Sequence, residues 1–132
     1  RGAALSIALA DIDHFKRIND EHSHGVGDRV LEHVAQVFRE RIGESDLVAR
    51  YGGEEFLFCL VGADEAEAAR ICEDLRHAVE GEHWPALAPG LAVTMSVGVA
   101  TLDGRQEVAT LLRQADARLY QAKRLGRNRV VA

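Results

Sequence analysis

The pair Gly52-Gly53 is the feature that most constrains how this chain folds. The two glycines join two strand-like runs, residues 46–51 and 54–61, through a link of only two residues. So short a link predicts a β-hairpin, and its tight turn is expected to need a positive φ at both glycines. A hairpin makes its two strands antiparallel. The chain is therefore expected to contain an antiparallel sheet.

The rest of the chain alternates between apolar runs and amphipathic stretches. Further strands are expected at the apolar runs, which are residues 5–10, 91–100 and 128–131. Apolar residues that recur every three or four positions predict helices over residues 28–42, 68–79 and 108–122. A short helix is also expected over residues 14–22, where a cap is available. Residues 22–28 and 81–90 are expected to be loops, and Gly98 to mark a bulge or a close approach within its strand.

The resulting order, β-α-α-β-β-α-β-α-β, predicts an α+β fold. We expect a mostly antiparallel sheet flanked by helices, of the nucleotide-cyclase and polymerase-palm (ferredoxin-like) type. The 132 residues are expected to form a single domain. Because the first strand begins almost at the first residue, we expect the chain to be part of a longer protein.

Composition excludes several classes of function. Apolar residues make up 47% of the chain and charged residues 28%, as in ordinary globular proteins, and the formal charge is −5. An acidic balance argues against binding to nucleic acid or to an anionic membrane. No apolar run is long enough to span a membrane. Two cysteines, Cys59 and Cys72, are too few for a disulfide scaffold, so a reduced, cytoplasmic domain is expected.

Four carboxylates stand at the ends of expected strands. Asp11 and Asp13 follow the first strand, and Glu54 and Glu55 follow the glycine pair. If the hairpin pairs with the first strand, Asp11 and one glutamate meet at one sheet edge, where they could hold magnesium. Only one glutamate is expected there, because successive strand residues point to opposite faces. The alternative is that Asp13 caps the following helix and the hairpin tip is solvated.

The segment from Asn19 to Asp28 gathers an amide, an imidazole from His24 and a carboxylate. A carboxylate and an amide match the donors and acceptor of a guanine edge. The alternative is a loop between two helices, in which Asp28 is the N-cap of the second helix.

The basic residues are fourteen arginines and only two lysines, Lys16 and Lys123. Lys123 and Arg127 are four residues apart and share a helix face. Cations at the end of a helix compensate the helix dipole; the alternative is that they bind phosphate.

Five blocks, in order and covering nearly the whole chain, resemble the GGDEF family of diguanylate cyclases. They are residues 11–20, His24-x-x-Gly27-Asp28, residues 50–56 with Gly52-Gly53-Glu54-Glu55-Phe56, residues 96–100 and residues 115–128. The resemblance implies a fold like that of class III nucleotide cyclases. It also implies a reaction in which two GTP molecules condense to cyclic di-GMP and release two pyrophosphates, across two copies of the domain.

The resemblance also implies roles for individual residues. Asp11, the main-chain carbonyl of Ile12 and Glu54 would hold magnesium or manganese, and Glu54 would be the base for the attacking 3′-hydroxyl. The remaining residues would bind the nucleotide. Lys16, Lys123 and Arg127 would neutralise the triphosphate, and Gly52 and Gly53 would let it approach the main chain. Asn19 and Asp28 would read guanine, with His24 beside them.

Three departures from the family pattern affect what is expected. Ser23 stands where the family usually has glycine. Gly43 replaces the arginine of an inhibitory Arg-x-x-Asp product site, of which Asp46 remains, so weak or absent feedback inhibition is expected. The family's lead-in helix is absent, so the isolated chain and the full protein can differ in activity.

Two other functions are alternatives to the cyclase. A non-catalytic GTP-binding regulatory domain is the alternative within the family, but Glu54 and Glu55 are both present, which favours an enzyme. An RNA-binding module of ferredoxin-like topology is the other alternative. Such a module would stack bases on aromatic side chains, and the chain has only seven of these, which disfavours it. The expected partners are GTP, a second copy of the domain, and a fused sensory or regulatory domain, which could anchor the full protein to a membrane.

Overall fold

The computed structural model describes residues 4–104 and 106–132, which contain a five-stranded sheet in the order β2-β3-β1-β4-β5. The strands are β1 (Leu5–Ile12), β2 (Leu47–Arg50), β3 (Glu55–Val61), β4 (Met95–Thr101) and β5 (Val130–Val131). The pairs β1–β3, β1–β4 and β2–β3 are antiparallel, and only β4–β5 is parallel. The predicted mostly antiparallel sheet is confirmed.

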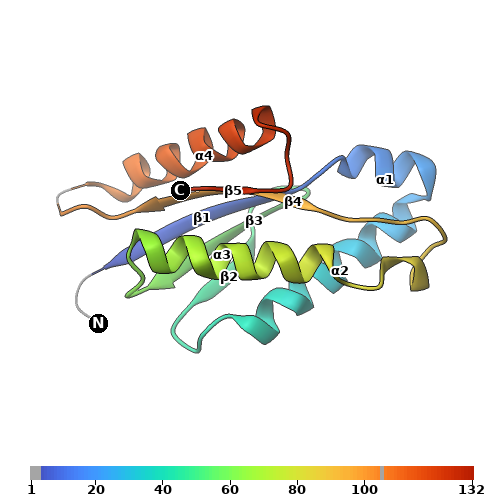
Figure 1. The fold of residues 1–132 in the computed structure, drawn as a ribbon, viewed down its shortest axis with the longest axis horizontal. Coiled ribbons are helices and arrows are strands. Elements are labelled where there is room, and N and C mark those ends of the chain that lie inside the picture. Colours follow the sequence, from blue (N-terminus) through green and yellow to red (C-terminus); the bar gives the residue numbers. More distant parts are fainter. Residues whose placement is uncertain (1–3, 105) are drawn as a thin grey trace.

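Helices cover both faces of the sheet. They are α1 (Phe15–Glu21), α2 (His24–Arg41), α3 (Glu65–Glu80), the short 3-10 helix η1 (Trp84–Ala86) and α4 (Val108–Arg124). Figure 1 shows α4 on one side of the sheet and α2 and α3 on the other. The first strand is apolar at nearly every position because alternate residues serve two cores: Ala8, Ala10 and Ile12 pack on the α2 and α3 side, whereas Ile7 and Leu9 pack under α4.

Gly98 is the point where α4 approaches the sheet most closely. A Cβ at this position would overlap the main-chain oxygen of Ala115 and the main-chain nitrogen of Leu119. The predicted close approach within the strand is therefore confirmed, and it brings the end of α4 towards the end of β1.

The hairpin forms as predicted, but its turn does not. The link between β2 and β3 comprises residues 51–54, and neither Gly52 nor Gly53 has a positive φ. The turn is closed by the Tyr51 N–H, which donates to the Glu55 carbonyl at 2.8 Å. Because the chain reverses its direction over four residues instead of two, no residue of the turn needs the left-handed conformation.

Two element boundaries differ most from prediction. The second helix begins at His24 rather than at residue 28, because the Ser23 hydroxyl accepts the Val26 N–H at 3.1 Å; Asp28 is therefore not the N-cap. The fourth strand begins at Met95 rather than at residue 91. Leu91 is buried without being in a strand, which an apolar run alone cannot indicate.

Within residues 4–104 and 106–132, no helix is both long and apolar enough to cross a bilayer.

Candidate functional site

A small cleft opens where β1 ends, and several predicted site residues line it. Its volume is about 190 Å³. The lining residues come from the β1–α1 segment, the hairpin turn and the end of α4, and are Asp11, Ile12, Asp13, His14, Phe15, Lys16, Glu54, Lys123 and Arg127. The fold therefore gathers the metal-binding and phosphate-binding sets predicted from the sequence.

Asp11 and Lys123 form an ion pair at the centre of this cleft. The Lys123 ammonium lies 2.7 Å from Asp11 Oδ2, and Asp11 is only 7% exposed. Burial raises the pKa of Asp11 above its ordinary value, and although the bond from Lys123 opposes that shift, it does not reverse it; the charges of Glu54 and Asp13 add to the increase. A carboxylate that is buried among other carboxylates is stabilised by any further cation that approaches it.

Both glutamates of the hairpin lie close to Asp11. Glu55 is the register partner of Asp11 across β1 and β3, and burial, followed by the charge of Asp11, raises the pKa of Glu55. Glu54 lines the cleft, and its carbonyl accepts the Ile12 N–H at 3.2 Å. Of the two glutamates only Glu54 lines the cleft, which agrees with the expectation of one glutamate there. Strand alternation is not the reason, because Glu54 precedes β3.

The donor chemistry at this edge fits a hard cation. Asp11 and Glu54 offer carboxylate oxygens, and Ile12, which also lines the cleft, has a main-chain carbonyl. Lys123 already neutralises Asp11 there, so a positive charge is accommodated. Among the described residues, no three His, Cys, Asp or Glu side chains are grouped as metal ligands. The predicted set contains two such side chains and one carbonyl.

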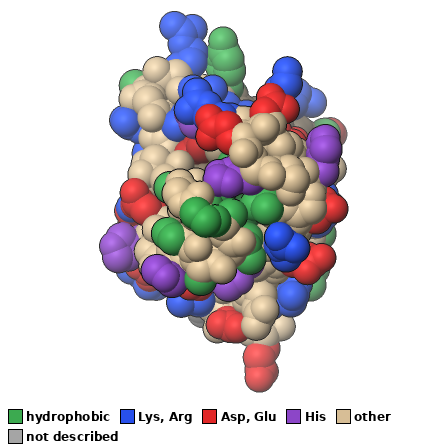
Figure 2. All heavy atoms as spheres, turned by 90° about the vertical axis from the view of Figure 1, so that its right-hand side faces the viewer, with side chains coloured by type: hydrophobic (Ala, Val, Ile, Leu, Met, Phe, Trp, Pro, Cys, Tyr) green, Lys and Arg blue, Asp and Glu red, His purple; other side chains and the backbone are tan. Residues whose placement is uncertain are grey.

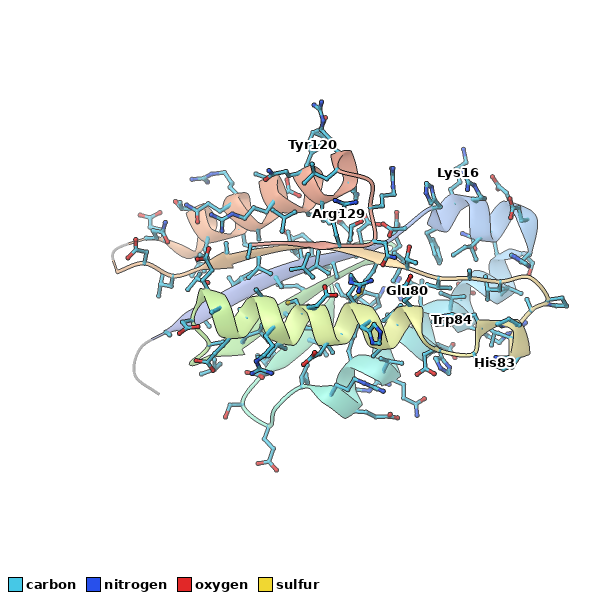
Figure 3. All side chains as sticks on the ribbon, viewed as in Figure 1. Lys16, Glu80, His83, Trp84, Tyr120 and Arg129 are labelled. Atoms are coloured by element: carbon cyan, nitrogen blue, oxygen red, sulfur yellow. The ribbon has the colours of Figure 1, made fainter. Side chains whose placement is uncertain are left out.

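Two further cations complete the lining. Lys16 projects from the exposed side of α1 (Figure 3), and Arg127 follows the end of α4. Figure 2, which views the molecule from the α1 end, shows acidic and basic side chains side by side in its upper part, on the side where α4 lies. With Lys123, the cleft holds three cations beside its carboxylates, which is a suitable arrangement for a metal-bound polyphosphate.

The residues predicted to read guanine lie at the junction of α1 and α2. Asn19 packs against Gly27, where a Cβ would overlap the Asn19 amide oxygen. That oxygen is buried and has no hydrogen-bond partner among the described residues. His24 and Asp28 are exposed, one turn apart on α2. The structure thus brings Asn19 to the first turns of α2.

The glycine pair lies in the exposed turn next to Glu54. A Cβ at Gly53 would meet nothing within 4 Å, whereas one at Gly52 would come within 3.1 Å of the Glu55 carboxylate. Packing within the protein therefore does not require glycine at position 53. Neither glycine is among the residues that line the cleft.

Sequence reasoning missed the part played by Asp13. Asp13 does not cap α1, whose N-cap position is His14 and has no side-chain cap. Its carboxylate instead accepts hydrogen bonds from the Thr94 and Ser96 hydroxyls and from the Asn128 N–H. The signal that was available is the pair of polar residues, Thr94 and Ser96, within an apolar run.

A larger cleft, of about 310 Å³, lies on the other side of α1 and shares Asp13 and His14 with the first. Arg17, Glu21 and His22 also line it. None of the predicted metal-binding or phosphate-binding residues lines the larger cleft. The candidate site is therefore chosen by its cluster of charges and not by its volume.

Known proteins similar to this chain share its fold and its sequence blocks. The family described as "Diguanylate cyclase, GGDEF domain" matches residues 1–129. Diguanylate cyclase DosC of Escherichia coli is 42% identical over 130 residues, which are 98% of this chain and 28% of that protein. The chain thus spans less than a third of the length of this curated relative.

Two solved structures superpose closely on this chain. The active GGEEF domain of a diguanylate cyclase from Vibrio cholerae has a TM-score of 0.90 and 35% identity, and covers 97% of this chain and 81% of its own. The GGDEF domain of DgcB from Caulobacter crescentus, solved in complex with c-di-GMP, has a TM-score of 0.92 and 35% identity. The match covers 99% of this chain and 78% of the DgcB chain.

Proposed function

Because the chain belongs to the GGDEF family of diguanylate cyclase domains, we propose that it condenses two GTP molecules to cyclic di-GMP and releases two pyrophosphates. The observation that carries this proposal is the cleft in which Asp11 and Glu54 lie beside Lys123, Lys16 and Arg127. Carboxylates for a metal ion and cations for phosphates meet there, as nucleotidyl transfer requires.

The carboxylates would hold the metal on which this family depends. Asp11, Glu54 and the carbonyl of Ile12 are the proposed ligands, and Mg²⁺ is the proposed ion, with Mn²⁺ also compatible with oxygen donors. When bound, the ion would polarise the α-phosphate and lower the pKa of the attacking 3′-hydroxyl. Glu54 would take the proton from that hydroxyl.

The cations would stabilise the triphosphate and the leaving pyrophosphate. Lys123 pairs with Asp11 at 2.7 Å, so its ammonium lies beside a carboxylate that would hold the metal and within reach of phosphates bound there. Lys16 and Arg127 approach the cleft from α1 and from the turn after α4. Positive charges fixed before the reaction stabilise the charge that develops on the leaving group.

Guanine would be read at the α1–α2 junction. The amide oxygen of Asn19, which has no hydrogen-bond partner among the described residues, would accept from a guanine N–H. Asp28 offers a second acceptor, with His24 beside it on α2. Gly52 and Gly53 would let the triphosphate pass the hairpin turn.

Catalysis is proposed to require two copies of the domain. Sites for small molecules usually have volumes of about 300–1,000 Å³, whereas this cleft has about 190 Å³, so it holds only part of a nucleotide. Each GTP must also attack the other. A second copy, facing the first, would bring the second nucleotide and enclose the reacting groups.

The chain's longer relatives support a larger assembly. Since this chain corresponds to 28% of the E. coli relative, we propose that a sensory or regulatory domain is fused to it in the full protein. A cytoplasmic location, where GTP is available, is part of the proposal.

The test is GTP turnover with Mg²⁺ over a range of protein concentrations, on this chain and on the full protein. We expect cyclic di-GMP to form at a rate that rises more steeply than linearly with protein concentration. Glu54→Ala is expected to lower the rate by about 100-fold or more, because it removes a metal ligand and the base. Glu44→Ala, at an exposed position, is the matched control.

The outcomes separate the candidate functions. Metal-dependent GTP binding without product, in both the chain and the full protein, would contradict the cyclase and support the GTP-binding regulatory domain. A rate linear in protein concentration would contradict the two-copy mechanism.

A further inference from the structure

The turn after α4 has two adjacent non-glycine residues in the left-handed conformation. Arg127 has a φ of 64° and Asn128 a φ of 48°. Asparagine adopts this conformation readily, but most other residues adopt it at a cost. Such a conformation persists only where the surrounding structure holds it, and the contacts of this turn show what does so.

The end of α4 fixes the chain as far as Arg127. The Gly126 N–H donates to the Lys123 carbonyl at 3.4 Å, and the Arg127 N–H donates to the Ala122 carbonyl at 3.0 Å. With φ of 124° at Gly126, this pair of bonds is a Schellman motif. The motif explains how the helix stops, but it makes no contact with Asn128.

Asp13 holds the main chain at Asn128. Asp13 Oδ2 accepts the Asn128 N–H at 3.0 Å and the Thr94 hydroxyl at 2.7 Å, and Oδ1 accepts the Ser96 hydroxyl at 2.6 Å. Asp13 is 5% exposed. Since both of its oxygens are engaged within the protein, Asp13 differs from Asp11 two residues earlier, which has a cation as its partner.

The side chain of Asn128 is held from the opposite direction by α3. Arg76 donates to its amide oxygen at 2.7 Å, and its amide nitrogen donates to Glu80 at 2.9 Å. Arg76 is itself fixed by ion pairs with Glu73 and Glu80. Figure 3 shows Glu80 on the end of α3 that lies towards this turn. Asn128 is thus anchored through its main chain and through its side chain, on two different elements.

We propose that Asp13 and Asn128 are positioning residues, which hold the turn so that Arg127 points at the triphosphate in the cleft. The proposal rests on the proposed function. Arg127 lines the same cleft as Asp11 and Glu54, and it immediately precedes the residue that Asp13 anchors. A turn free to leave the left-handed conformation would carry the guanidinium away. Asp13 also lines the cleft, but both of its oxygens are bonded within the protein, so it acts on the substrate through Arg127.

The test is a double-mutant cycle on nucleotide affinity. The probe is a GTP analogue with a methylene between the α- and β-phosphates, bound in the presence of Mg²⁺ and measured by calorimetry. We expect Asp13→Asn and Arg127→Ala each to weaken binding by about tenfold, and the double variant to bind within about twofold of Arg127→Ala alone. Losses that multiply in the double variant would show that Asp13 acts independently of Arg127 and would overturn the proposal.

A control variant separates positioning from general loosening. Ser96→Ala removes one donor to Asp13 but leaves the bond to Asn128, so its affinity should stay within about twofold of wild type. A loss as large as that of Asp13→Asn would overturn the proposal.

If Asp13→Asn does not fold, Asn128→Gly takes its place. Glycine adopts the left-handed conformation but loses the contacts with Arg76 and Glu80. Its loss of affinity should likewise disappear in the Arg127→Ala background; a loss that remains would overturn the proposal. Failure of the wild-type chain to bind the analogue would overturn the proposed function as well, whereas wild-type binding that these variants leave unchanged would overturn the positioning role alone.

Discussion

At the scale of single residues, Asp11 shows how a cation site opposes stability. Burial raises the pKa of Asp11, which means that folding disfavours the charged form that a metal ion needs. The bond from Lys123 offsets part of this cost. A sequence selected for stability alone would place a neutral residue at the end of this buried strand. A carboxylate at this position agrees with the proposed role of Asp11 as a metal ligand, because a bound cation would offset the cost of its burial.

In the cluster around Arg76 the carboxyl pKa values are lowered, whereas that of Asp11 is raised. This lowering predicts a pH dependence of stability. The bond from Arg76 lowers the pKa of Glu73, and bonds from Arg76 and Asn128 lower the pKa of Glu80. The folded state thus binds these protons less tightly than the unfolded state. The stabilisation is present above the ordinary value of 4.5 and is lost as the pH falls through the lower, folded-state values.

Arg76→Met should therefore lower the melting temperature at neutral pH, and the difference from wild type should shrink as the pH is lowered to about 3. Thermal unfolding followed by circular dichroism over a pH series measures this. Arg70→Met is the matched control, since Arg70 and Asp74 form an exposed pair at 3.7 Å that contributes little at any pH. A difference that does not change with pH would show that Arg76 stabilises through packing and its bond to Asn128 and not through the two glutamates.

At the scale of elements, the contact between α4 and the sheet depends on one glycine. Gly98→Ala places a Cβ into the main chain of α4 at Ala115 and Leu119, which cannot move as a flexible side chain can. We expect a loss of about 3 kcal/mol in the free energy of unfolding, measured with urea. Gly53→Ala, which meets nothing within 4 Å, should change the free energy of unfolding by less than about 0.5 kcal/mol. Equal stability of the two variants would contradict the close approach.

The elements themselves could be predicted, because apolar periodicity reports burial. The prediction from apolar periodicity fails where a residue is buried without belonging to a helix or strand. Leu91 is buried outside any strand, so its apolar run extends the predicted strand too far. At the start of α2, Gly25 and Gly27 are typical of a loop, yet Gly27 is needed because the Asn19 side chain occupies the space of its Cβ. That requirement comes from another helix and leaves no local pattern.

The same limit applies to the site. Asp11, Glu54 and Lys123 are predicted from motifs that are each continuous in sequence, and the structure brings them to one cleft. The role of Asp13 could not be predicted, because its partners Thr94 and Asn128 lie 81 and 115 residues away. A carboxylate directly before a helix usually caps it. Only the antiparallel pairing of β1 with β4 brings the Thr94 and Ser96 hydroxyls to Asp13 instead.

At the scale of the whole molecule, the expectation of weak product inhibition rests on the loop that leads into β2. Asp46 remains from the family's inhibitory motif, but both its oxygens serve the fold. Oδ1 accepts the Val61 N–H at 2.9 Å, and Oδ2 accepts the Gly43 N–H at 3.2 Å. Gly43, at the position of the motif's arginine, offers no guanidinium. Asp46 therefore holds the loop against β3 and lacks the cation with which it would bind cyclic di-GMP.

We therefore expect cyclic di-GMP to bind weakly outside the cleft and to inhibit turnover little. Gly43→Arg should strengthen product binding by about tenfold or more, because a guanidinium binds phosphate through paired, charge-assisted hydrogen bonds. Glu44→Arg introduces the same side chain one residue away and should have a smaller effect. Calorimetry with cyclic di-GMP, alongside inhibition of turnover, measures both. Tight binding by the unaltered chain that is lost on Asp46→Ala would show that the carboxylate binds product without its arginine, and feedback control would then be intact.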